Sequence, residues 1–265
     1  MKRDLRWAEA NRLRIIFDFG TDALDRFLSL TQKGYVRRPK IVDRSGHESV
    51  RFVNPTPEDA ILLKFARLVS LNKCLVLLID SGFVQEQCII QRAIEETNED
   101  IVFLSINVTD SGESDKFEAF LQDFWKEDYQ NPSDPVGSRI GRGYSRKGIR
   151  PFLHRVFGSP NPSMADDVSR AVYEMYSGFA HGAAPHIFEL YDFDAEIFLT
   201  NGLRGTNRHL DYVMDASNSI YRSMLSMKGV AKSFGSQQLL DLANQMIDEF
   251  VSRVGIENLE KQANR

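Results

Sequence analysis

Cysteine is scarce in this chain of 265 residues, which contains only Cys74 and Cys88. The two do not form a Cys-x-x-Cys pair, and no metal-ligand cluster accompanies them. Disulfide frameworks belong to oxidising compartments, so we expect a reducing, cytoplasmic setting in which both residues are core thiols. A Cys74–Cys88 bridge is the alternative. The sequence predicts neither a metal site nor a cofactor.

Long hydrophobic runs are also missing. The longest, at residues 74–79 and 101–104, are far shorter than the roughly 18 apolar residues that span a bilayer. The N-terminus begins Met-Lys-Arg but continues through Asp4, Arg6 and Glu9, so it lacks the apolar region of a signal peptide. We therefore expect a soluble protein without membrane association.

Several enzyme signatures are absent as well. The chain has no P-loop, no Gly-x-Gly-x-x-Gly motif and no Gly-x-Ser-x-Gly elbow. His181, His186 and Glu189 come closest to a metal set, but their spacing suits neither one helix face nor a His-Glu-x-x-His motif. These absences argue against nucleotide hydrolysis of the P-loop type, serine hydrolysis and zinc catalysis.

Charge is nearly balanced along the chain except in one stretch. The net charge of -4 argues against a protein that coats nucleic acid over its whole surface. Residues 135–165 contain no acidic residue, and we expect their cations to form a phosphate- or nucleic-acid-binding patch. The candidate residues are Arg139, Arg142, Arg146, Lys147 and Arg150. The alternatives are a disordered loop, or a partner for the acidic stretch 95–134.

The hydrophobic pattern predicts an all-α protein. Helical spacing covers residues 3–32, with a break or kink at 20–22, and then 57–79, 83–98, 114–130, 150–157, 166–181, 208–234 and 236–254. Residues 35–54 suit an irregular or extended segment, and 186–200 a small β-hairpin. We expect a single helical domain over 1–265, with an N-terminal helical extension at 1–54 and a basic flexible loop at 131–162.

One predicted helix carries an ordered polar stripe. At 100° per residue, Arg170, Glu174, Ser177 and His181 fall within about 60° of one another, so they share a face. The opposite side is apolar and is expected to be buried; it consists of Val168, Val172, Met175, Tyr176 and Phe179. A polar stripe is also what a solvated surface or a buried structural network presents.

Two motifs together resemble a known group of proteins. The first is Arg92-x-x-x-Glu96, and the second is Tyr176-Ser177-x-x-x-His181-Gly182. This combination is similar to an uncharacterised bacterial helical family related to the HEPN superfamily, over about residues 56–100 and 165–225. The resemblance implies a helical bundle associated with antiphage defence or toxin–antitoxin systems, in a superfamily whose better-known members cleave RNA.

The chain departs from the ribonucleases of that superfamily at one point. Those enzymes place an arginine upstream of the catalytic histidine, with four to six residues between them. No arginine precedes His181 at that interval, and Arg170 lies about 16 Å away along the helix axis. Arg204 and His209 have the required interval but straddle a predicted helix start.

Two functions follow from these observations. The first is an RNA- or nucleotide-binding HEPN-like protein of bacterial defence, with metal-independent RNA cleavage as its candidate activity. His181 would then be the general acid or base, Arg92 would stabilise phosphate charge, and Glu96 and Ser177 would orient them. The second is a non-catalytic interaction or sensor module that binds a protein partner, such as an antitoxin, a defence component or a second copy of the chain.

Overall fold

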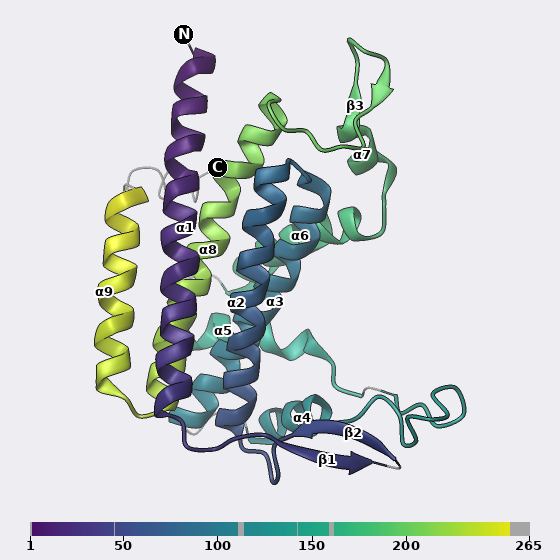
Figure 1. Cartoon of the computed structure of the whole chain (residues 1–265), viewed down its shortest axis with the longest axis vertical. Helices are drawn as coiled ribbons and strands as arrows, with labels where there is room; N and C mark the ends of the chain where they lie inside the picture. The colour runs from purple at the N-terminus through teal and green to yellow at the C-terminus, as the bar shows by residue number, and fades with distance from the viewer. Residues whose placement is uncertain (1, 45, 111–113, 142, 159–161, 255–265) are drawn as a thin grey trace.

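The structure, a computed structural model, describes residues 2–44, 46–110, 114–141, 143–158 and 162–254 (Figure 1). These residues form helices and two small antiparallel hairpins, which confirms the predicted all-α bundle with a small β-hairpin insertion. None of the described helices is both long and apolar enough to cross a bilayer.

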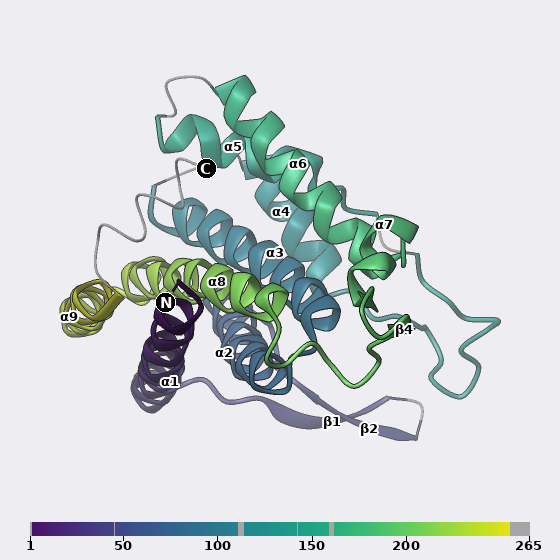
Figure 2. The same ribbon diagram turned by 90° about the horizontal axis from the view of Figure 1, so that it is seen from above.

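Five long helices form the main bundle: α1 (Lys2–Gly34), α2 (Pro57–Ser81), α3 (Val84–Thr109), α8 (Asn207–Ser233) and α9 (Gln237–Val254). Helix α8 packs against the other four and lies at the centre of the bundle, as the view from above shows (Figure 2). Three shorter helices, α4 (Ser114–Phe124), α5 (Ile149–Val156) and α6 (Pro162–Ala180), cover α3 from outside.

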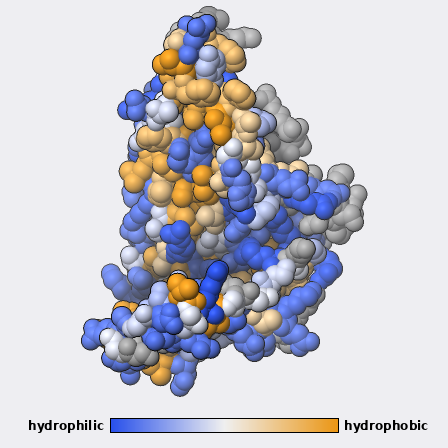
Figure 3. Space-filling model, turned by 90° about the vertical axis from the view of Figure 1, so that its right-hand side faces the viewer, coloured by the Kyte–Doolittle hydropathy of each residue, from blue (hydrophilic) through white to orange (hydrophobic). Residues whose placement is uncertain are grey.

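Both extended segments form hairpins. Strands β1 (Lys40–Arg44) and β2 (His47–Arg51) pair within the segment expected to be irregular or extended. The hairpin predicted over 186–200 is confirmed but shorter, with β3 (Tyr191–Asp192) paired to β4 (Ile197–Phe198). Residues before it form helical turns, α7 (Ala184–Ile187) and η2 (Phe188–Leu190). Hydrophobic residues gather over much of the upper half of the side that carries this hairpin (Figure 3).

Helix α1 corrects two expectations. It runs unbroken through residues 20–22, because Gly20 is enclosed by neighbouring helices: a Cβ there would lie 2.6 Å from Ile220 and 2.9 Å from Phe250. The glycine therefore serves close packing rather than a kink. Buried side chains of α1, among them Phe17 and Phe27, belong to the main core, so α1 is part of the bundle rather than an appended extension.

Local signals fix both ends of α2. Thr56 accepts a hydrogen bond from the Asp59 amide, and the Asp59 carboxylate accepts one from the Thr56 amide, which forms a capping box. Pro57 occupies the first turn, as predicted. At the other end Gly82 adopts φ of 78° and approaches Arg204 so closely that a Cβ would lie 2.4 Å from its amide nitrogen.

Helix α3 extends beyond its predicted end at residue 98 and continues to Thr109. The acidic residues at 95–100 lie inside the helix and are paired with cations: Glu96 with Arg92 of α3 itself, and Glu95, Glu99 and Asp100 with cations from other elements. Helix α4 is shorter than predicted and ends at Phe124 instead of 130. Within the segment 131–162, the helix predicted over 150–157 is present as α5, and a short 3-10 turn, η1 (Arg146–Gly148), precedes it.

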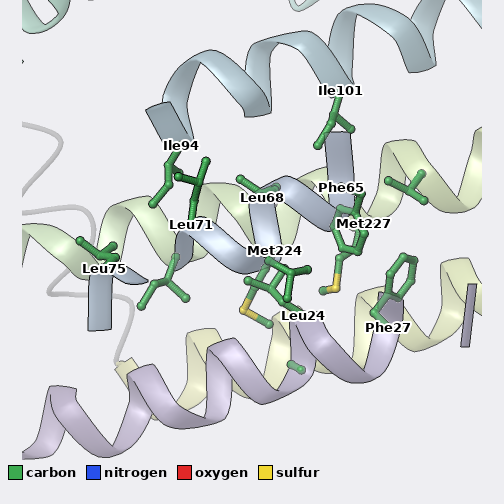
Figure 4. Close-up of a cluster of buried hydrophobic side chains, with 14 of the residues drawn as sticks. Leu24, Phe27, Phe65, Leu68, Leu71, Leu75, Ile94, Ile101, Met224 and Met227 are labelled. Carbon is green, nitrogen blue, oxygen red and sulfur yellow. The ribbon is translucent and has the colours of Figure 1, made fainter. Parts of the chain in front are cut away.

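The core is continuous across the bundle. Figure 4 shows Leu24 and Phe27 of α1 facing α2 and α8, where Met224 and Met227 fill the space between helices. Each fully buried side chain of this size contributes about 1.5–3 kcal/mol by leaving water. On the other side of α3 the Phe103 ring packs against the rings of Phe120 and Phe152, which attaches α4 and α5 to the bundle.

Candidate functional site

Helices α3 and α6 pack side by side in opposite directions (Figure 2). The side chain of Gln85 at the start of α3 donates to the carbonyl of His186, just beyond α6, at 2.6 Å. One turn further along α3, Cys88 packs with Tyr176 and Phe179, and Arg92 then contacts Tyr173. Residue numbers thus fall along α6 as they rise along α3, which determines where each predicted site residue lies.

Arg92 and Glu96 are engaged with each other and with α6. The Nε of Arg92 lies 3.2 Å from Oε1 of Glu96. The Arg92 guanidinium lies 4.2 Å from the centroid of the Tyr173 ring and donates to the Tyr173 hydroxyl. Arg150 of α5 also packs against this ring, 4.7 Å from its centroid. Arg92 therefore forms an ion pair within α3 and a cation–π contact with Tyr173 that joins α3 to α6.

Ser177 and His181 lie at the other end of the α3–α6 contact. Ser177 is half-buried and His181 is exposed. His181 follows Tyr173, the partner of Arg92, by eight residues, about 12 Å along a helix axis. Because the helices are antiparallel, Glu96 lies still further from His181. The two pairs, Arg92 with Glu96 and Ser177 with His181, are therefore separated along the α3–α6 contact, although each pair shares a face of its own helix.

The polar stripe of α6 is mostly solvated. Arg170 and Glu174 are exposed, and Arg170 pairs with Asp167 one turn away. On the apolar side only Tyr176 and Phe179 are buried, whereas Val172 and Met175 are 39% and 45% exposed. The side chain of Val168 lies outside the described residues. The expected burial of the whole apolar flank is therefore corrected.

The small residues around His181 serve the helix end. Gly182 adopts φ of 63°, and the amide of Ala183 donates to the carbonyl of Gly178 at 2.9 Å. Gly178 also makes room for His186, since a Cβ there would lie 2.2 Å from its Nε2. The His186 ring packs on Phe179 at 4.1 Å between centroids. Among the described residues, no three His, Cys, Asp or Glu side chains are grouped so as to hold a metal ion.

A polar cluster around Asp215 joins α3, α6 and α8 beside this contact; Gln91 and Tyr176 are buried, whereas Asp215 itself is partly open to solvent. Asp215 accepts hydrogen bonds from Gln91 at 3.0 Å and from the hydroxyl of Tyr176 at 3.4 Å. Burial raises the pKa of Asp215 above its ordinary value, and burial likewise raises the pKa of the Cys88 thiol and of Tyr176. A thiol held protonated in this way is a poor nucleophile. Both cysteines are free, so the alternative disulfide is not formed.

The acid-free segment neutralises the acidic face of α3. Arg150 Nε lies 2.6 Å from Glu99 Oε1, and Arg146 pairs with Glu99 at 3.1 Å and with Asp100. Lys64 of α2 completes the network at 2.7 Å from Asp100. This is the arrangement expected if the segment were a partner for the acidic stretch. These two guanidiniums are occupied within the fold.

The other three predicted phosphate contacts are placed differently. Arg139 is exposed, and its backbone forms an isolated antiparallel β-bridge with Tyr129. Arg142 and the side chain of Lys147 lie outside the described residues. The described part of the segment therefore presents Arg139 to solvent and directs Arg146 and Arg150 inward.

A groove with a volume of about 490 Å³ lies between α3, α5 and α8. Its apolar lining comes from Val102, Ile106, Leu153, Phe157 and Leu225. Its polar lining comes from Glu95, Asn98, Glu99, Ser105, Thr109, Asp110, Arg150, His154, Arg222, Ser226, Lys228 and Lys232. We call this feature the α3–α5–α8 groove.

Two ion pairs cross the rim of the groove. Arg222 lies 2.8 Å from Glu95, and Arg150 pairs with Glu99 as described. Burial raises the pKa of Glu95, and the neighbouring Arg222 opposes that shift. Lys228 and Lys232, one turn apart on α8, make no hydrogen bond or ion pair within the described residues. These two lysines are the cations of the groove that remain available to a ligand.

Sequence reasoning missed the groove. The i,i+4 spacing of Lys228 and Lys232 was visible, but a lysine pair on a helix is usually a solvated face.

Comparison with models of known families gives no match, and comparisons with curated proteins and with solved structures give none either.

Proposed function

We propose that the protein is a non-catalytic binding module, a sensor or interaction protein, that receives a ligand in the α3–α5–α8 groove. The observation that carries this proposal is the groove itself, which combines an apolar lining with Lys228 and Lys232, two cations that have no partner within the described part of the chain. Its volume falls within the range of about 300–1,000 Å³ typical of small-molecule sites. The resemblance to the HEPN-related family suggests bacterial defence or toxin–antitoxin biology as the setting.

The arrangement of the four predicted catalytic residues supports binding over catalysis. Metal-independent RNA cleavage needs a base near the 2′-hydroxyl and a cation near the developing phosphorane charge. Arg92 is held by Glu96 and Tyr173, about two helical turns from His181. A cation in that position does not reach a phosphate bound at His181.

The binding function is tested by blocking the groove. Leu225 is 38% exposed and lines the groove, so Leu225→Trp fills it without entering the core. Leu77→Trp is the matched control, because Leu77 is 67% exposed on α2 and does not line the groove. Thermal melts are recorded with a panel of nucleotides, organic acids, sugar phosphates and neutral compounds. We expect a compound that stabilises the wild type and Leu77→Trp but not Leu225→Trp; a panel without such a compound counts against the proposal.

A HEPN-type ribonuclease is the second candidate, and the exposure of His181 one turn after Ser177 favours it. The test is incubation of wild type, His181→Ala and Arg92→Met with labelled total RNA in EDTA. We expect no cleavage by any of them. Arg92→Met should lower the melting temperature because Arg92 packs on Tyr173, whereas His181→Ala should not. Cleavage by the wild type that is lost in His181→Ala would establish the ribonuclease instead.

A further inference from the structure

We infer that the α3–α5–α8 groove binds an amphipathic anion, meaning a single carboxylate or phosphate group attached to an aliphatic or aromatic body. This inference rests on the proposed function, since it names the class of ligand that the same groove takes. It follows from how apolar and charged side chains are distributed around the groove.

The apolar body of the ligand has a continuous surface to contact. Val102 and Ile106 are one turn apart on α3, so they lie on the same face. Leu153 from α5 and Leu225 from α8 line the groove with them. The exposed Phe157 at the end of α5 adds an aromatic ring that an apolar ligand would cover. These side chains come from three helices, so a ligand would be contacted from more than one side.

Charge in the groove favours an anionic head group. The ion pairs of Arg222 with Glu95 and of Arg150 with Glu99 cancel four of the charges along the rim. The remaining formal charges are Lys228, Lys232 and Asp110, which leaves one net positive charge. Because the two lysines are one turn apart on α8, a single carboxylate or phosphate can lie between them.

The groove also holds an unsatisfied hydroxyl. Ser105 is only 4% exposed, and its Oγ has no hydrogen-bond partner among the residues that the structure describes. Gly229 faces it, and a Cβ at that position would lie 3.0 Å from the Ser105 Oγ. The absence of a side chain at Gly229 therefore keeps α8 close to α3 at this hydroxyl, which is the buried polar group of the lining without a partner of its own. An oxygen of the ligand head group is a suitable acceptor for it.

The same lining disfavours two other classes of ligand. A polyphosphate would carry several negative charges past Glu95, Glu99 and Asp110, with two available lysines to compensate them. A neutral apolar compound would leave both ammonium groups beside an apolar surface without counter-charge. An anion with one charged group and an apolar body matches both the two lysines and the apolar lining of the groove.

The test compares ligands that differ only in the head group. Decanoate, decyl phosphate and neutral decanol are titrated below their aggregation limits into wild type, Leu225→Trp and the double variant Lys228→Gln/Lys232→Gln. The charge-matched control is Lys33→Gln/Lys40→Gln, which changes two exposed lysines outside the groove. We expect the two anions to bind the wild type and the control alike, at least tenfold more tightly than decanol. Affinity should fall at least tenfold in Lys228→Gln/Lys232→Gln and be lost in Leu225→Trp.

Each other result has a distinct meaning. Decanol binding as tightly as the anions, or unchanged affinity in Lys228→Gln/Lys232→Gln, overturns the anionic class, while loss of binding in Leu225→Trp would still support the groove as a ligand site. No binding of any of the three compounds also overturns the inference, and the broader panel with Leu225→Trp and Leu77→Trp then decides the proposed function. Co-sedimentation with phosphatidate-containing vesicles distinguishes a lipid head group from a free amphiphile. Binding that occurs only with vesicles would contradict the inference that the groove takes a free amphiphile.

Discussion

The ion pair between Arg150 and Glu99 should contribute a measurable coupling energy, because it attaches α5, one wall of the groove, to α3. Their closest atoms are 2.6 Å apart, and the two side chains are 20% and 18% exposed. Unit charges about 4 Å apart attract by about 4 kcal/mol at an effective dielectric constant of ~20. Desolvation offsets much of this attraction, whereas fully exposed pairs contribute only ~0.2–1 kcal/mol. We therefore expect a coupling energy of about 1–2 kcal/mol, between these limits.

The assay is a double-mutant cycle built from Arg150→Met, Glu99→Gln and the double variant, with unfolding free energies from urea titrations. Methionine keeps much of the apolar contact with Tyr173, and Arg146 remains paired with Asp100. The control cycle uses Arg253→Met and Glu249→Gln, a pair one turn apart on α9 with side chains 45% and 44% exposed. That pair should couple by about 0.3–0.5 kcal/mol. Equal coupling energies in the two cycles would refute the structural role assigned to the basic segment.

Three further predictions concern single side chains. Burial raises the pKa of Asp215, so the folded chain holds this proton more tightly than the unfolded chain. Wild-type stability should therefore fall relative to Asp215→Asn as pH rises above about 4, the ordinary pKa of an aspartate, and a stability difference independent of pH would contradict this. A thiol reagent should modify Cys74, which is partly exposed, in the native state and should reach Cys88, which is 1% exposed, only after unfolding; equal rates would show that Cys88 is accessible. Phe103→Ala should lower the unfolding free energy by about 3–5 kcal/mol, while Val36→Ala at a position that is 89% exposed should leave it unchanged. A loss under about 1 kcal/mol for Phe103→Ala would mean that α4 and α5 are not attached through this ring.

Much of the helical architecture could be predicted because its signals are local. Thr56, Pro57 and Asp59 specify the start of α2 within one turn, whatever the rest of the chain does. The ends of α8 and α9 lie within one residue of their predicted positions for the same reason. The kink expected at Gly20 was wrong because its packing partners, Ile220 and Phe250, are distant in the sequence.

The end of α3 was predicted too early, and the sequence left two roles open for the basic segment. The helix was predicted to end at residue 98, just before Glu99 and Asp100, and Arg146 and Arg150 were assigned to a phosphate-binding patch. In the folded chain these acidic residues and these arginines form ion pairs with one another. Charge patterns along a sequence do not reveal such pairs, because the partners are separated by about fifty residues.

The candidate site was the least predictable feature. His181 and Arg92 were found because motifs draw attention to titratable residues on helices, but whether they meet depends on the direction and register of α3 against α6. The groove is built from three segments that are far apart in the sequence, within residues 95–110, 150–157 and 222–232. Only the packing of α5 and α8 against α3 brings Lys228 and Lys232 to an apolar surface.

The most direct test of ligand binding in the α3–α5–α8 groove is a heteronuclear NMR titration of the isotope-labelled protein with decyl phosphate. We predict that the largest chemical-shift changes fall on backbone amides within residues 102–110, 150–157 and 225–232, and that they disappear in Leu225→Trp. Changes centred on residues 173–187, around Tyr173 and His181, would place the site on α6 and contradict this account.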